Sequence, residues 1–137
     1  MMNLNETQNP LLTKSIRFSL QIIELNKYLV TEKRIYSLAD QILRSGTSVA
    51  ANIVEAQHAV SKPDFFSKLG ISLKEAAETQ HWLYLLWKSD YIDEERFNQL
   101  DAACEELLKM LIAITKHQKE SYEKKGRKNR DVVENVQ

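Results

Sequence analysis

The chain of 137 residues has the size of a single domain with its own core. Its 19 Lys and Arg balance 19 Asp and Glu, which argues against a uniformly basic nucleic-acid-binding protein. Three Gly and two Pro predict few turns and long elements, and a single cysteine excludes an internal disulfide. The polar start is unlike a signal peptide and no apolar run is long enough for a membrane span, so we expect a cytoplasmic protein with no membrane partner.

Apolar residues recur at steps of three and four along most of the chain, which predicts four helices. We expect them from Thr13 or Lys14 to Thr31, from Ser37 to His58, from Ser61 to Asp90, and from Asp93 to about Lys124. Connections this short make neighbouring helices antiparallel. The sequence therefore predicts an all-α fold, an up-down-up-down antiparallel four-helix bundle over 13–124. A flexible segment over 1–12 precedes it, and a polar, partly basic tail over 125–137 follows it.

The stretch RSGTSVAANIVEAQ, residues 44–57, has the composition of a loop but the apolar spacing of a helix. Aligning the helices places Ile22, Gly46, Ala76 and Leu107 in one layer, where small residues face large ones. The predicted inner seam of the third helix is Phe66, Leu69, Leu73, Ala76, Gln80, Leu83 and Trp87. Gly46 costs the helix up to ~1 kcal/mol in propensity, and close packing is expected to outweigh that cost.

The same helix carries a family resemblance. QILRSGTSVAANIVEA (41–56), FFSKL (65–69), SLKE (72–75) and SDYI (89–92) resemble segments of the bacterial four-helix-bundle proteins encoded in intervening sequences of large-subunit ribosomal RNA genes. The resemblance covers roughly residues 14–120, and one departure is Ala56, where the family usually has Gly.

This resemblance implies a cytoplasmic, non-enzymatic bundle that forms a ring-shaped homo-oligomer, often a pentamer. A related branch is similar to the accessory proteins of diversity-generating retroelements, which bind a reverse transcriptase and nucleic acid. The resemblance supplies no catalytic residue and no cofactor. Its structural motif corresponds to Gly46, Ser48, Asn52 and Glu55, and we expect the polar members to form hydrogen bonds between helices.

Two Glu-x-x-His motifs, at 55–58 and 78–81, raise the possibility of a di-iron site of the kind found in helical bundles. The predicted alignment separates them by ~25 Å along the bundle, which is too far for shared metal ligands. An ion pair between Glu78 and Arg44 is the favoured interpretation, and no metal is expected. Cys104 is expected in the core rather than as a nucleophile.

Apolar residues exceed what the inner seams need, which indicates association with other chains. The surplus residues are Ile16, Leu20, Ile23, Trp82, Leu86, Leu108 and Ile112. A wider monomer core is the alternative interpretation. Base stacking on Trp82 is disfavoured, because no Lys or Arg interleaves closely with it.

Residues 116–130 contain seven Lys or Arg against two Glu. The candidate nucleic-acid-binding residues are Lys116, Lys119, Lys124, Lys125, Arg127, Lys128 and Arg130. We expect the helix to fray at Gly126, and a merely solvated tail is the alternative. Two functions remain open. One is a non-enzymatic homo-oligomeric scaffold that binds RNA or DNA through this segment, and the other is a protein-interaction adaptor, for example for a reverse transcriptase.

Overall fold

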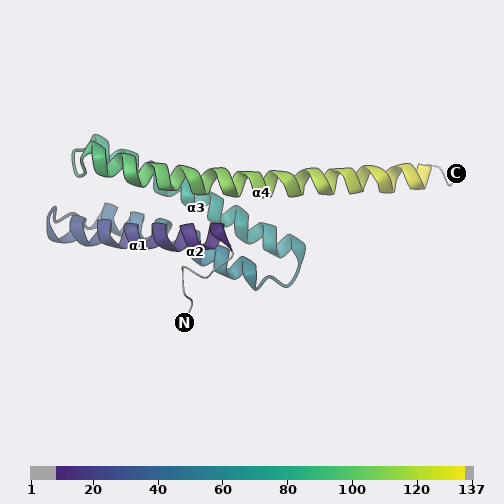
Figure 1. The fold of residues 1–137 in the computed structure, drawn as a ribbon, viewed down its shortest axis with the longest axis horizontal. Helices are drawn as coiled ribbons and strands as arrows, with labels where there is room; N and C mark the ends of the chain where they lie inside the picture. The colour runs from purple at the N-terminus through teal and green to yellow at the C-terminus, as the bar shows by residue number, and fades with distance from the viewer. Residues whose placement is uncertain (1–8, 135–137) are drawn as a thin grey trace.

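The computed structural model describes residues 9–134, apart from the side chains of Lys119, Tyr122, Val133 and Glu134. The fold is all-helical, as predicted (Figure 1). Its elements are α1 (Pro10–Thr31), α2 (Ser37–Gln57), α3 (Lys62–Lys88) and α4 (Glu94–Glu134). Each helix packs on its neighbour in sequence, and α4 returns against α1, while the diagonal pairs make no close approach within the described residues. This arrangement is compatible with the predicted up-down-up-down order.

Helix starts and ends follow local chemistry. The Asn9 side chain accepts a hydrogen bond from the Leu12 amide at 3.2 Å, so α1 begins at Pro10, earlier than expected. Residues 1–8 of the segment expected to be flexible lie outside the described residues. At the end of α3, Asp90 has a left-handed φ of 64° and the Tyr91 amide donates to the Leu86 carbonyl at 2.9 Å. This turn reverses the chain into α4.

The α1–α2 contact matches the predicted layer. A Cβ built on Gly46 would lie 2.8 Å from two carbons of the Ile22 side chain, closer than packed atoms approach. Ile22 is fully buried, so it has little room to move aside. A residue with no side chain is therefore required at position 46 for α1 and α2 to pack at this distance.

The α2–α3 contact corrects the predicted seam of α3. Leu69, Ala76 and Leu83 are buried as expected, and the other buried positions are Ser72, Thr79 and Leu86. The predicted positions Phe66, Leu73, Gln80 and Trp87 are only half-buried.

Two hydroxyls explain the difference. The Ser72 hydroxyl donates to the Val49 carbonyl at 2.8 Å, and Thr79 donates to the Ser45 hydroxyl at 2.8 Å. Both buried polar groups are thereby satisfied, and their small size lets α2 and α3 approach closely.

The surplus apolar residues divide between core and surface. Leu86 and Leu108 are buried in the core, and Ile16 and Trp82 pack against it, so the wider-core interpretation holds for these four. Leu20 and Ile112 remain 52% and 49% exposed. Within the described residues, no helix is long and apolar enough to cross a lipid bilayer.

Cys104 is fully buried between α3 and α4, as expected, and its thiol contacts the Ala76 carbonyl at 3.2 Å. Burial, together with the nearby carboxylates of Asp101 and Glu105, raises the pKa of the Cys104 thiol to about 12, and burial is the largest of these causes. The thiol is therefore protonated at neutral pH and is a poor nucleophile.

The glycines of α2 and α3, Gly46 and Gly70, give a matched stability test. Gly46→Ala is expected to lower the free energy of unfolding by about 1–3 kcal/mol, because the new methyl overlaps Ile22. Gly70→Ala is expected to raise it by up to ~1 kcal/mol, because a Cβ there meets nothing within 4 Å and alanine favours a helix. Urea denaturation of both variants measures the difference, and a shift of both in the same direction would contradict this account.

Cys104 gives a reactivity test. In the folded protein at about pH 8, iodoacetamide is expected to leave Cys104 unmodified, whereas the chain unfolded in guanidinium chloride should take one label. Because the folded pKa is higher than the unfolded one, the thiol's contribution to stability is full below the unfolded pKa and is lost as pH rises toward 12. Mass spectrometry counts the labels, and rapid labelling of the folded protein would show that the thiol is accessible.

Candidate nucleic-acid interface

The second half of α4 projects well past the other helices (Figure 1). The predicted helix end near Lys124 and the fraying at Gly126 are therefore wrong, since the helix continues to Glu134. Gly126 has no left-handed φ, so it does not cap the helix. Once the bundle holds the first half of α4, each further residue adds a hydrogen bond without a new nucleation cost, and Lys, Arg and Glu favour this extension.

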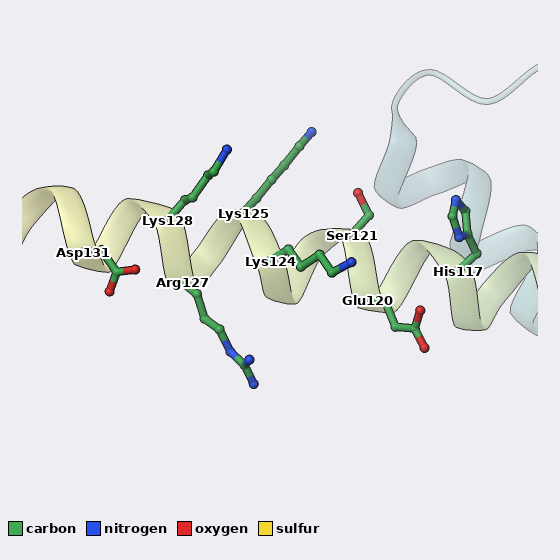
Figure 2. A pocket seen from close by; sticks show the side chains of 8 residues that line it. All are labelled: His117, Glu120, Ser121, Lys124, Lys125, Arg127, Lys128 and Asp131. Atoms are coloured by element: carbon green, nitrogen blue, oxygen red, sulfur yellow. The ribbon is translucent and has the colours of Figure 1, made fainter.

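The continued helix places several predicted basic residues in a row. Lys124, Lys125 and Lys128 follow Ser121 and His117 at helical spacing, and we call these five residues the basic row. In Figure 2, His117, Ser121, Lys125 and Lys128 point to one side of the helix, whereas Arg127 and Glu120 point to the other. Lys124 lies across the front of the helix in this view, and its spacing of four residues from Lys128 places both on neighbouring turns of one face.

The basic row borders an open hollow of about 520 Å³ (Figure 2). All eight lining residues come from α4, so the hollow has no opposite wall and cannot enclose a small molecule. The lining residues are His117, Glu120, Ser121, Lys124, Lys125, Arg127, Lys128 and Asp131. A one-sided surface of this kind is suited to an extended polyanion rather than to a compact ligand.

The remaining predicted binding residues are distributed around the same helix. Lys116 and Arg130 are exposed, and the Arg130 guanidinium donates to the Gly126 carbonyl at 3.3 Å. The side chain of Lys119 lies outside the described residues. Among the described side chains, no ion pair involves a residue beyond Glu106. Among these described side chains, the lysines of the basic row therefore form no direct ion pair, although Glu120 and Asp131 line the same hollow.

Two polar residues of the α2 motif, Ser48 and Asn52, form hydrogen bonds within their own helix. The Ser48 hydroxyl donates to the Arg44 carbonyl at 2.6 Å, and the Asn52 amide donates to the Ser48 carbonyl at 2.8 Å. Both bonds lie within α2, so the predicted hydrogen bonds between helices are wrong for these residues. Only Glu55 reaches another helix, through an ion pair with Lys68 of α3 at 3.3 Å. Ser45, one residue before Gly46, supplies the buried interhelical hydroxyl instead.

The glutamates of the two Glu-x-x-His motifs interact with residues other than metal ligands. Glu78 pairs with Arg44, as predicted, and it also accepts a hydrogen bond from the Trp82 indole at 3.2 Å. His58 and His81 are exposed. Within the described residues, no group of three or more His, Cys, Asp or Glu is placed to hold a metal ion.

A groove between α3 and α4, which we call the aromatic–acidic groove, was not predicted from the sequence. It has a volume of about 490 Å³ and is lined by Ala77, Gln80, His81, Tyr84, Trp87, Phe97 and Asp101. Trp87 stacks on Phe97 with ring centroids 4.4 Å apart. The Gln80 amide donates to Asp101 at 3.2 Å and to Glu105 at 2.8 Å. The sequence feature that points to this site is the spacing of Asp101 and Glu105, which lie one helical turn apart on α4 and face Gln80 of α3.

Comparison with known proteins identifies the bundle. The family model described as 23S rRNA-intervening sequence protein matches residues 7–113. A solved structure from Bacteroides thetaiotaomicron VPI-5482, described as a protein with unknown function from the S23 ribosomal protein family, is 45% identical. The alignment covers 77% of this chain and 98% of that chain, with a TM-score of 0.77. No curated protein matches the chain.

The family match ends before the basic row begins, because residue 113 precedes His117. The bundle is therefore the shared part, and the projecting half of α4 lies C-terminal to the match. The matched region includes all of α1, α2 and α3 and the bundled half of α4. The chain belongs to the 23S rRNA-intervening sequence protein family.

Proposed function

We propose that the protein is a non-enzymatic, homo-oligomeric cytoplasmic scaffold that binds RNA or DNA through the basic row. The observation that carries the proposal is the row itself: Lys124, Lys125 and Lys128 lie on one strip of a projecting helix without an ion-pair partner among the described side chains. Unpaired Lys side chains on a surface bind nucleic-acid phosphates, and this binding releases the counterions that are condensed on the nucleic acid.

The expected binding mode is backbone recognition without base reading. The basic row offers Lys ammonium groups, which contact phosphates as point charges, and it offers no amide side chain for a base edge. Glu120 and Asp131 at the border of the row keep the affinity of each helix modest. Several copies in one assembly would multiply that affinity through their effective concentration.

Nucleic-acid binding is tested with a salt series. Wild-type protein is expected to bind duplex RNA or DNA with log K falling by about 0.9 per unit of log salt for each phosphate neutralised. Lys125→Gln with Lys128→Gln should reduce that slope by about 1.8, because two phosphate contacts are lost. Truncation after Tyr122 should remove most of the binding. Fluorescence anisotropy with a labelled duplex measures all three.

The matched control is Lys33→Gln with Lys74→Gln, which removes the same charge from exposed positions outside α4. Its salt slope should equal that of the wild type. Equal losses in both double variants would show a dependence on net charge alone. Unchanged binding after truncation would refute the basic row as the site, and absence of binding by the wild type would favour the protein adaptor.

The homo-oligomeric part of the proposal is supported by apolar residues that the fold leaves exposed. Leu20 of α1 and Ile112 of α4 are each about half exposed. Removing such surface from water contributes about 25 cal/mol per Å² to association. The family resemblance implies five copies.

Oligomerisation is tested by placing charges at these positions. Wild type is expected to run as a defined homo-oligomer in light scattering at tens of micromolar, and Leu20→Lys with Ile112→Lys should release monomers, because burying an unpaired charge costs several kcal/mol. Val60→Lys is the control, since Val60 is 92% exposed and its change should leave the mass unaltered. A monomeric wild type would contradict the homo-oligomeric part of the proposal.

A further inference from the structure

The aromatic–acidic groove has Asp101 in its lining, and Glu105 lies one helical turn further along α4. Asp101 and Glu105 are half-buried, and their described polar partner is the neutral Gln80 amide. Neither carboxylate forms an ion pair among the described side chains. A phosphate would be repelled at this site, whereas a cation would be attracted.

The aromatic end of the groove also favours a cation. The Lys88 ammonium lies 4.1 Å from the centroid of the Trp87 ring and 5.9 Å from that of Tyr84, which shows that these ring faces accept a positive charge. Tyr84 is 48% exposed, so part of its ring remains open to an incoming side chain. Because Trp87 already contacts Phe97 and Lys88, an incoming lysine stem would lie along Tyr84 while its ammonium reaches the carboxylates.

The basic row matches this groove in spacing as well as in charge. Asp101 and Glu105 are four residues apart on α4, and Lys124 and Lys128 are four residues apart on the same helix. Residues at this spacing lie about 6 Å apart on one face of a helix. Two ammonium groups of one helix can therefore meet two carboxylates of another helix at the same time.

A chain cannot make this contact with itself. Both sets of residues belong to one continuous helix, and Lys124 lies about 35 Å along α4 from Asp101 at 1.5 Å per residue. Figure 1 shows the first half of α4 against the other helices and the second half projecting beyond them. The occupant must come from another molecule.

We propose that the aromatic–acidic groove of one protomer binds the basic row of a second copy, with Lys124 and Lys128 against Asp101 and Glu105. The contact joins two different surfaces, so it is head-to-tail and produces a ring or a filament. It does not depend on nucleic-acid binding by the row, but it uses the same lysines, so a bound polyanion and a docked groove exclude each other.

A charge swap tests the proposal in the full-length chain. Sedimentation velocity at about 50 mM and about 500 mM salt should show wild-type self-association that weakens with salt. The groove variant D101K/E105K and the row variant K124E/K128E should each weaken low-salt association about tenfold or more, because like charges then meet. An equimolar mixture of the two variants should restore it, since the basic groove of one can bind the acidic row of the other.

D101N/E105Q is the second groove variant. Its amide oxygens can still accept hydrogen bonds from Gln80, so this variant separates loss of charge from loss of the fold. It should weaken low-salt association less than D101K/E105K does. Self-association of either groove variant at the wild-type level, or no recovery in the mixture, would overturn the proposal. Salt-independent association that only Leu20→Lys with Ile112→Lys removes would also overturn it. RNA binding by the same variants tests the proposed function separately from self-association. The groove variants should retain RNA binding, and the row variant should lose it.

Discussion

The contact of Ile22 with the backbone of α2 at Gly46 is the constraint on which the bundle depends. It brings α1 to a distance from α2 that no larger residue at position 46 would allow. The next contacts extend the same face of α2, because Ser45 and the Val49 carbonyl accept hydrogen bonds from Thr79 and Ser72 of α3. Close packing against α1 at Gly46 and satisfied hydroxyls toward α3 thus fix the relative positions of three helices.

The fourth helix has two halves with different environments. Its first half completes the core with Leu100, Cys104, Leu107 and Leu111, all of them buried. Its second half has lost that apolar pattern and is held straight by its continuity with the first. The carboxylates of Asp101 and Glu105 lie on the bundled half, and the unpaired lysines lie on the projecting half. One helix therefore holds these two carboxylates and the lysines of the basic row far apart along its length.

The sequence predicted the fold class and the α1–α2 layer, because apolar periodicity and the size of residue 46 report directly on packing. It misassigned the seam of α3, since Ser72 and Thr79 look like surface residues until the acceptors on α2 are known. The helix end was missed for a related reason. Gly126 after two lysines predicts a frayed helix end, whereas the chain there propagates a helix already nucleated in the bundle.

The candidate basic residues were identified from composition, but their arrangement was not. A frayed tail would have placed Lys124, Lys125 and Lys128 in no fixed relation, and only the continued helix orders them in a row. A fixed row matters physically, because cations held at a regular spacing meet phosphates, or a pair of carboxylates, without first ordering a flexible chain. The aromatic–acidic groove depends on the same principle, since Gln80 holds both carboxylates in place through one amide. The carboxylates and the lysines have the same spacing because both pairs are four residues apart on α4.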